Sequence, residues 1–129
     1  MKMVLIVDDE FDIAYALGSV FEEEGFEVRS CSNGRECLEE LERGCPDLLM
    51  LDLMMPIMGG PEVLKAIRKD PRFARLPVIL MSAVSPTESQ EEYGWQAFLQ
   101  KPFTLPVLLE RVHALVGAAP AEESERAHG

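Results

Sequence analysis

The stretch Leu48-Leu49-Met50-Leu51-Asp52 decides the fold of this chain. It is apolar at every position until it ends in a carboxylate, and Pro56 and the pair Gly59-Gly60 follow it. A run without polar alternation cannot be half exposed, so it predicts a central parallel strand that helices cover on both faces. Asp52 then lies at the carboxyl end of that strand, which is the edge where open α/β sheets bind their ligands.

The bulk composition favours one acidic globular domain. The length of 129 residues matches an ordinary domain, and 47% apolar with 27% charged residues argues against disorder over most of the chain. We expect the domain to occupy residues 1–117 and the polar residues 118–129 to form a flexible tail or the start of a linker. The formal net charge of −11 opposes binding to nucleic acid or to anionic membranes, so the expected partners are proteins or metal ions.

The sequence carries few signals of compartment. No apolar run is long enough to span a bilayer, and Met1-Lys2 leads directly into an apolar strand without a secretory signal. The three cysteines are odd in number and lack metal-ligand spacing; they are Cys31, Cys37 and Cys45. These features predict reduced cysteines in a cytoplasmic protein.

Four further strands are expected around the central one. Three are short, mainly apolar runs that end near a polar residue, at Met3–Val7, Val78–Met81 and Ala97–Gln100. The stretch Phe26–Cys31 alternates more strongly, as an edge strand does. Segments with helical periodicity separate the strands, so the sequence predicts a doubly wound α/β fold with a five-stranded parallel sheet.

The segment Ser85–Gly94 stands where the fourth helix of this pattern belongs, but it contains almost no apolar residue. A helix without an apolar face has nothing to bury, so we expect a short or irregular helix here. Trp95 follows this segment and could either pack over it or anchor a partner from an exposed position. In the last helix Thr104 is expected to cap the first turn, and the residues expected to face the core are Leu105, Leu108, Leu109, Val112, Leu115 and Val116.

Charged and hydroxyl side chains gather at the predicted strand ends. Asp8 and Asp9 follow the first strand, and Asp52 ends the central one. Three carboxylates in one crevice repel one another unless a cation joins them, and Mg²⁺ is a hard ion that prefers such oxygen ligands. Lys101 and Ser82 stand at two further strand ends, where an ammonium and a hydroxyl can bind phosphoryl oxygens. These residues form a sufficient set for phosphoryl transfer to Asp52.

Taken in order over residues 3–116, the motifs resemble those of the receiver domain of two-component response regulators: Val7-Asp8-Asp9, Asp52 with Met55-Pro56 and Gly59-Gly60, Ser82-Ala83, and Lys101-Pro102-Phe103. The resemblance implies a flavodoxin-like strand order of 2-1-3-4-5. It implies that the phosphohistidine of a sensor histidine kinase or of a phosphotransfer protein phosphorylates Asp52. It also implies a downstream protein partner or a fused output domain, and therefore a signalling switch rather than an enzyme that acts on other molecules.

The resemblance assigns a metal site and its surroundings. Mg²⁺ would be held by Asp9, Asp52 and the carbonyl oxygen of Met54, with Asp8 acting mainly through water. Met54 stands two positions beyond the phosphate acceptor Asp52, and Val84 stands two positions beyond Ser82. Both are apolar and cannot orient an attacking water, so we expect a long-lived aspartyl phosphate.

The resemblance also assigns the phosphate ligands and the switch. Lys101 and Ser82 would bind the phosphoryl group, and Phe98 would turn inward when Ser82 moves toward the phosphate. The peptide bond between Lys101 and Pro102 would be cis. The interval from Ser82 to Lys101 is shorter than the usual one by about one helical turn, so we expect the usual output surface, and a homodimer built on it, to be altered.

Other classes of function fit parts of the pattern. Taken singly, Asp52 could be a helix cap and Lys101 a solvated lysine, but neither reading explains why all the motifs occur together. An aspartyl-phosphate phosphatase or phosphotransferase needs an acid where Met54 stands. A flavin carrier needs a phosphate-binding loop rich in Ser, Thr and Gly after the first strand, and this sequence has none there. The main alternative is a receiver-like protein-interaction module that acts without phosphorylation, and the intact acid pair, acceptor and lysine argue against it.

Overall fold

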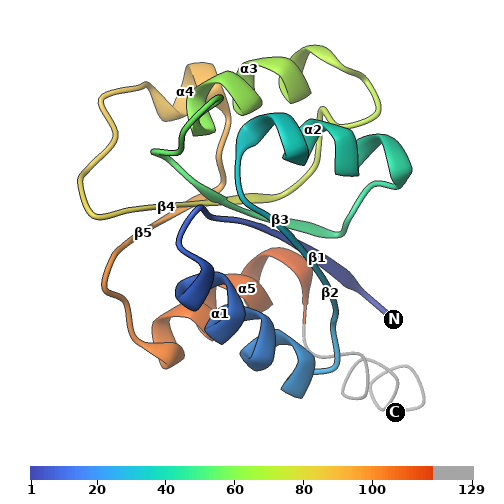
Figure 1. The fold of residues 1–129 in the computed structure, drawn as a ribbon, viewed down its shortest axis with the longest axis vertical. Helices are drawn as coiled ribbons and strands as arrows, with labels where there is room; N and C mark the ends of the chain where they lie inside the picture. Colours follow the sequence, from blue (N-terminus) through green and yellow to red (C-terminus); the bar gives the residue numbers. More distant parts are fainter. Residues whose placement is uncertain (118–129) are drawn as a thin grey trace.

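The computed structural model describes residues 1–117 (Figure 1), and the predicted tail at residues 118–129 lies outside the described residues. Within the described range, five strands alternate with five helices. The strands are β1 Met3–Val7, β2 Glu27–Cys31, β3 Leu48–Asp52, β4 Val78–Ser82 and β5 Ala97–Gln100. The helices are α1 Phe11–Glu23, α2 Gly34–Arg43, α3 Gly60–Lys69, α4 Gln90–Tyr93 and α5 Leu105–Val116.

All neighbouring strands pair in parallel, and their order across the sheet is β2-β1-β3-β4-β5. The predicted flavodoxin-like order is therefore confirmed. β3 lies in the middle, with Leu49 paired to Leu5 of β1 and to Val78 of β4, and every residue of β3 is buried. β2 lies at one edge, and its residues are half-buried or exposed, as the alternating pattern of this stretch predicted.

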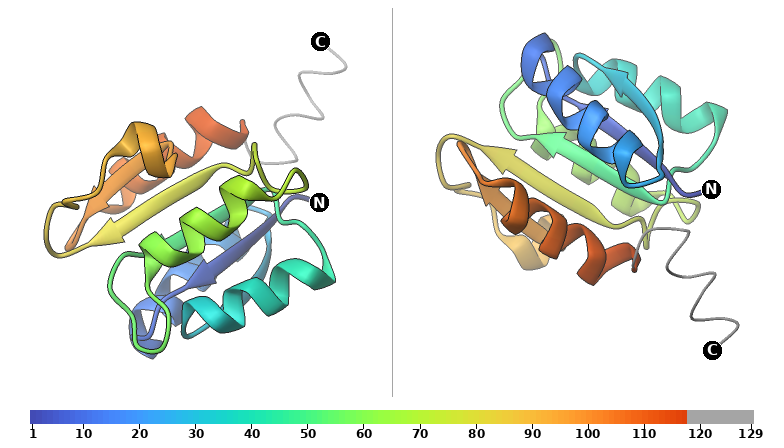
Figure 2. Two further views of the ribbon diagram at one scale, coloured as in Figure 1. Left: turned by 90° about the horizontal axis from the view of Figure 1, so that it is seen from above. Right: turned by 90° about the horizontal axis from the view of Figure 1, so that it is seen from below.

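Helices cover both faces of the sheet (Figures 1 and 2). α1 and α5 lie on one face, whereas α2, α3 and α4 lie on the other. Successive residues of a strand point to opposite faces. Leu49 and Leu51 therefore join the core beneath α2 and α3, while Leu48 and Met50 join the core beneath α1 and α5. The central strand is apolar at every position because both of its faces are buried.

The loop after β3 returns close to the end of that strand. Gly60 begins α3, and its N–H donates a hydrogen bond to the carbonyl oxygen of Leu53 at 2.9 Å. A Cβ atom at Gly60 would lie 2.7 Å from the carbonyl oxygen of Asp52, which is closer than a side chain tolerates. Glycine at this position therefore allows α3 to start directly beside Asp52.

The fourth helix is a single turn, as its lack of apolar residues predicted. α4 has no buried residue, and Ser89 caps it by accepting a hydrogen bond from the N–H of Glu92. The end of α4 is held by Arg68 of α3, whose guanidinium donates to the carbonyl oxygen of Gly94 at 2.6 and 3.1 Å. The same guanidinium donates to the carbonyl oxygen of Leu76 at 2.8 Å. Tyr93 is the residue of α4 that packs partly against the core, and the contacts of Arg68 with Gly94 add to this small apolar contact.

The surroundings of Trp95 decide between packing inside the domain and an exposed position that anchors a partner. Trp95 is 7% exposed and belongs to the core between the sheet and the helices α2 and α3, so it packs inside the domain. All three cysteines are free, which agrees with the prediction of reduced thiols. Among the described helices, none is long and apolar enough to cross a membrane.

Two predictions about the start of α5 were wrong. Thr104 stands at the N-cap, but its side chain makes no capping hydrogen bond. Pro106 at the second helical position has no N–H, so one of the donors that a cap normally satisfies is missing. Leu105 was expected in the core but is 48% exposed. The core-facing side of α5 begins one turn later, with the buried residues Leu108 and Val112.

Candidate functional site

The carboxyl ends of four strands bring polar residues to one edge of the sheet. Asp8 follows β1, Asp52 ends β3, Ser82 ends β4 and Lys101 follows β5. The pairing of β3 with β4 places Asp52 beside Met81, one residue before Ser82. Asp8, Asp52 and Ser82 are only 2%, 5% and 3% exposed. Buried polar side chains at the ligand-binding edge of a parallel sheet mark this place as the candidate site.

Lys101 lies among the acidic residues of this edge. Its ammonium nitrogen Nζ is 2.8 Å from Oδ2 of Asp8 and 3.4 Å from Oδ2 of Asp52. A third carboxylate oxygen, Oε1 of Glu10, also lies 3.4 Å from this nitrogen. The Lys101 side chain is 12% exposed, so the acids largely enclose its charge. The structure thus brings together Asp8, Asp52 and Lys101, which the strand ends had predicted.

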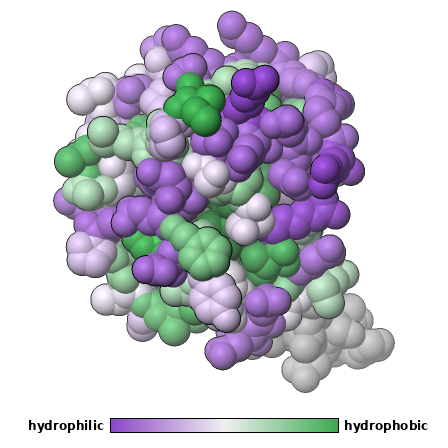
Figure 3. Space-filling model, in the orientation of Figure 1, coloured by the Kyte–Doolittle hydropathy of each residue, from purple (hydrophilic) through white to green (hydrophobic). Residues whose placement is uncertain are grey.

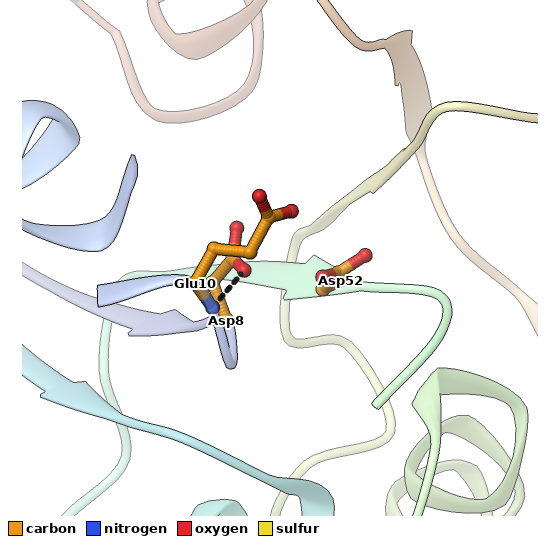
Figure 4. A group of neighbouring side chains, drawn as sticks. All are labelled: Asp8, Glu10 and Asp52. Atoms are coloured by element: carbon orange, nitrogen blue, oxygen red, sulfur yellow. Dashed lines mark hydrogen bonds between the residues drawn. The ribbon is translucent and has the colours of Figure 1, made fainter. Parts of the chain in front are cut away.

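Glu10 is the site residue that sequence reasoning missed. Carboxylate oxygens of Asp8, Glu10 and Asp52 lie within 4.8 Å of one another. Figure 4 shows the Glu10 side chain extending from the turn after β1 toward Asp52. The N–H of Glu10 donates to Oδ1 of Asp8 at 2.9 Å, and this bond turns the chain back over the strand end (dashed line in Figure 4). Asp9 is exposed and does not belong to this group, so its role as a metal ligand stays a prediction.

The signal for Glu10 was present in the sequence, since it is the third of three successive acids after β1. An extended chain sends alternate side chains to opposite sides. That rule does not apply to the three acids, because they lie in the turn between β1, which ends at Val7, and α1, whose N-cap is Glu10. The sequence therefore could not show which of them faces the pocket. The turn itself decides that Asp8 and Glu10 face the pocket.

Burial and charge make the site electrostatically unusual. The pKa of Asp52 is raised to about 7, first because the carboxyl is buried and second because Asp8 lies close. Lys101 and the N–H of Met54, 3.5 Å from Oδ1 of Asp52, offset part of this rise. For Lys101, burial lowers the pKa, but the contacts with Asp8, Asp52 and Glu10 outweigh burial and the pKa is raised overall. The site therefore holds more negative charge than one lysine neutralises, which favours a further cation.

The available donors suit a hard divalent cation. The neighbouring side chains of Asp8, Glu10 and Asp52 offer carboxylate oxygens, and the group contains neither sulfur nor imidazole. Oxygen ligands of this kind are typical of Mg²⁺ sites, where one or two carboxylates bind the ion and waters complete its coordination. The residues present at the strand ends thus fit the predicted magnesium ion.

The residues around the acidic group supply one hydroxyl and two apolar side chains. The Oγ of Ser82 accepts a hydrogen bond from the N–H of Val84 at 3.2 Å, which leaves its own hydrogen for another acceptor. Met54 and Val84 are 66% and 53% exposed. The expected lack of a polar group that could orient water and the lifetime of a phosphoryl group both stay predictions.

Phe98 occupies the strand position where the resemblance places the switch. It is paired with Leu80 across β4 and β5, is half-buried, and packs partly against the core beneath α2 and α3. A side chain between core and solvent has room to move in either direction, but its switching role stays a prediction. The peptide bond between Lys101 and Pro102 is cis, as the resemblance implied.

A groove of about 640 Å³ opens beside the acidic group, between α1 and α5. Glu10 and Lys101 line one end of it, and Figure 3 shows hydrophobic patches among the hydrophilic surface over these helices. Its apolar lining comes from Ile13, Leu17, Val20, Phe103, Leu105 and Leu108. Such a lining is typical of a surface that contacts another protein.

Comparisons with known proteins agree with this geometry. The family model of the response regulator receiver domain matches residues 4–113. The chain is 35% identical over 126 residues to the phosphate regulon transcriptional regulatory protein PhoB of Rhizobium meliloti, covering 95% of this chain and 55% of that protein. It is 32% identical over 132 residues to the sensory transduction protein RegX3 of Mycobacterium tuberculosis, covering 100% of this chain and 57% of that protein. The chain thus spans about half the length of the curated relatives it matches.

Solved structures with the same fold include two receivers with high coverage. Chemotaxis protein CheY4 of Vibrio cholerae superposes with a TM-score of 0.83 at 28% identity, covering 89% of this chain and 98% of that chain. Response regulator TrrA of Thermotoga maritima, solved in complex with Mg²⁺-BeF, superposes with a TM-score of 0.80 at 34% identity, covering 89% and 99%. Receiver domains are signalling switches of two-component systems and bind Mg²⁺ at an acidic pocket. This chain belongs to the response regulator receiver domain family.

Proposed function

We propose that this receiver domain accepts a phosphoryl group on Asp52 from the phosphohistidine of a sensor histidine kinase or of a phosphotransfer protein. The observation that carries the proposal is the position of Lys101, whose ammonium lies 3.4 Å from Asp52 and 2.8 Å from Asp8 at the shared strand edge. A fixed cation beside a carboxylate can neutralise the phosphoryl group which that carboxylate receives. Rigid strands hold both groups in place before the reaction.

Mg²⁺ is the proposed cofactor. Asp9, Asp52 and the carbonyl oxygen of Met54 would hold it, with Asp8 acting mainly through water, and the carboxylate of Glu10 lies near the same place. When bound, the ion neutralises the carboxylates and the phosphoryl oxygens. Because the pKa of Asp52 is raised to about 7, a share of this side chain is protonated and unreactive near neutral pH until positive charge enters the pocket.

In the transfer step, a carboxylate oxygen of Asp52 attacks phosphorus. The bond between phosphorus and the donor's imidazole nitrogen breaks, and its electron pair leaves with that nitrogen. Lys101 exchanges its contact with Asp52 for a phosphoryl oxygen, and the hydroxyl of Ser82 donates a hydrogen bond to another. Phe98 turns inward as Ser82 moves, which changes the surface that the output recognises.

The proposed partners follow from the surface and from the length of the relatives. The groove between α1 and α5 would receive the phosphodonor protein, because it is apolar and ends at Glu10 and Lys101. Curated relatives are nearly twice as long as the chain, so a fused output domain is proposed after residues 1–117, with residues 118–129 as the linker. A free downstream protein or a second copy of the chain would be alternative outputs, and the proposed location is the cytoplasm.

Acetyl phosphate with Mg²⁺ tests the proposed acceptor. We expect intact mass to increase by one phosphoryl group in the wild type, and no increase in Asp52→Ala or without Mg²⁺. Beryllofluoride, which mimics a phosphoryl group, should raise the unfolding temperature of the wild type only. If the wild type responds to neither reagent, the interaction module that acts without phosphorylation becomes the better reading. An equal mass increase in Asp52→Ala would place the acceptor elsewhere.

A further inference from the structure

Glu10 has no part in the transfer step described above, although its carboxylate belongs to the pocket. Oε1 of Glu10 lies 3.4 Å from Nζ of Lys101. The side chains of Asp8 and Asp52 are 0% and 7% exposed, whereas that of Glu10 is 59% exposed. Glu10 therefore lies on the solvent side of the acidic group, where an incoming phosphodonor meets it first.

The backbone holds Glu10 firmly in this position. Its N–H donates to Oδ1 of Asp8 at 2.9 Å, and its carbonyl oxygen accepts hydrogen bonds from the N–H groups of Ile13 and Ala14, both at 3.1 Å. Glu10 is also the N-cap of α1, but its side chain makes no capping hydrogen bond. The helix therefore does not use this carboxylate, which reaches Lys101 instead.

We propose that Glu10 is a specificity-determining residue that disfavours small anionic phosphodonors, an inference that rests on the proposed phosphorylation of Asp52. The negative charge of Glu10 slows phosphorylation by an anionic donor in two ways. It repels an approaching anion, and it gives Lys101 a further partner that a phosphoryl oxygen must displace. For one unit charge acting on a dianion across a partly screened surface, the expected effect on the rate is roughly three- to tenfold.

A protein phosphodonor is affected less by this charge. The groove between α1 and α5 is lined by Glu10 and Lys101 at the end where the acidic group lies. Docking in the apolar part of the groove supplies binding free energy that a small molecule lacks, and a basic side chain of the donor can pair with Glu10. Specificity then comes from a repulsive contact that only the docked protein overcomes.

Two small donors of different charge show whether the effect of Glu10 on the labelling rate depends on the charge of the donor. Acetyl phosphate is a dianion near neutral pH, and phosphoramidate is a monoanion. With either donor, a carboxylate oxygen of Asp52 attacks phosphorus. The phosphorus–oxygen bond to acetate, or the phosphorus–nitrogen bond to ammonia, breaks and the electron pair leaves with acetate or ammonia. The two donors also differ in their leaving group, so the effect of Glu10→Gln is taken as a ratio to the wild type for each donor, and these ratios are compared.

The test compares the wild type with Glu10→Gln at saturating Mg²⁺, following intact mass over time. We expect Glu10→Gln to be labelled by acetyl phosphate three- to tenfold faster at low ionic strength, with a smaller increase for phosphoramidate and a smaller one at high salt. Beryllofluoride carries a single negative charge, so in calorimetry it should bind Glu10→Gln more tightly by a factor close to that for phosphoramidate, a readout that needs no turnover. Glu23→Gln is the matched control, since Glu23 is an exposed glutamate at the other end of α1 and belongs neither to the groove lining nor to the carboxylate group. It should change either quantity less than twofold.

The outcomes distinguish this inference from the proposed function. If the wild type is labelled on Asp52 but Glu10→Gln is no faster, or if Glu23→Gln accelerates labelling as much, the role of Glu10 is overturned while phosphorylation of Asp52 stands. An acceleration that is equal for both donors and unaffected by salt would also overturn it, because the effect would not depend on charge. If neither protein is labelled and neither binds beryllofluoride, both proposals fail.

Discussion

Lys101 and Arg68 each contact oxygen atoms from separate parts of the chain, but the oxygens around Lys101 are charged and those around Arg68 are neutral. Lys101 meets three carboxylates, and burial, together with the nearby Asp8, raises the pKa of Asp52 to about 7. Arg68 meets neutral acceptors, namely the carbonyl oxygens of Phe73, Ala74, Leu76 and Gly94 and the amide oxygen of Gln96. The pocket around Lys101 holds three carboxylates for one ammonium, whereas the hydrogen bonds of Arg68 all go to uncharged oxygens.

Lys101 is therefore assigned to the proposed phosphoryl transfer, whereas Arg68 stabilises the fold. α4 buries none of its residues, so its position depends on Arg68 and on a few contacts such as that of Lys65 Nζ, 5.4 Å from the ring centre of Tyr93. Gly94 has a φ of 79°, and a Cβ there would lie 2.9 Å from Nε of Arg68. Glycine is therefore required both for the backbone conformation and for the approach of the guanidinium.

Arg68→Met should cause the largest loss of stability. It keeps much of the apolar stem but leaves carbonyl oxygens at the start of β4 and the end of α4 without their donor. We expect the free energy of unfolding to fall by roughly 3–4 kcal/mol, measured by urea denaturation. The control is Arg75→Met, because Arg75 is exposed in the same connection, and it should change stability by less than about 0.5 kcal/mol. Equal effects of the two substitutions would show that Arg68 does not hold α4.

Asp52→Asn should stabilise the metal-free protein, in contrast to Arg68→Met. The folded pKa of Asp52 is raised to about 7, above its ordinary value in an unfolded chain. Ionisation of this group therefore lowers stability; the penalty is absent below about pH 4, grows as pH rises, and is complete above about pH 7. A rise of about three pKa units corresponds to at most about 4 kcal/mol, and the loss of the contact with Lys101 offsets part of it, so we expect Asp52→Asn to exceed the wild type by roughly 2–4 kcal/mol at pH 8 and to equal it near pH 4. A difference that does not depend on pH would contradict this account of the pocket.

Lys101→Met should have a smaller effect on stability but a large effect on function. It leaves the buried carboxylates of Asp8 and Asp52 without their cation, and protonation of Asp52 limits the loss to about 1–2 kcal/mol at pH 7. Added Mg²⁺ should restore most of this loss, because it supplies positive charge to the same oxygens. Beryllofluoride binding should weaken by at least about tenfold. Lys69→Met, at an exposed position of α3, should show none of these changes, and the same response to Mg²⁺ there would refute the assignment.

The sheet and most of the pocket could be predicted from the sequence because they depend on periodicity and on strand ends. Short, uninterrupted apolar runs such as residues 48–51 favour buried strands, and parallel pairing then brings Asp52 and Lys101 to one edge. Side chains in turns could not be predicted in this way. The orientation of Glu10 depends on a hydrogen bond to Asp8 inside the turn after β1, which no periodic pattern encodes.

Tertiary packing limited the prediction in a second way. Trp95 could be placed only once the helices α2 and α3 were known to cover that part of the sheet. Leu105 continues the helical apolar pattern of α5, yet it lies in the first turn, beside the groove to α1, and remains 48% exposed. Pattern alone shows which residues can be buried, whereas the position of the neighbouring helix decides which are.

The smallest expected effect concerns the apolar side chains beside the pocket, which neither hold the fold nor carry charge. Met54 and Val84 are exposed next to Asp52 and Ser82 and offer no polar atom to orient a water molecule toward phosphorus. The aspartyl phosphate of the wild type should therefore persist well beyond seconds in buffer with Mg²⁺. Met54→Asn introduces an amide that can bind this water, so the label should decay roughly three- to tenfold faster, measured by intact mass after the donor is removed. Ile57→Asn, an equally polar change at the exposed Ile57 of the same loop, should leave the decay nearly unchanged. If the wild-type label is lost within seconds, water reaches the phosphorus without help from this position, and the apolar pair does not protect the phosphoryl group.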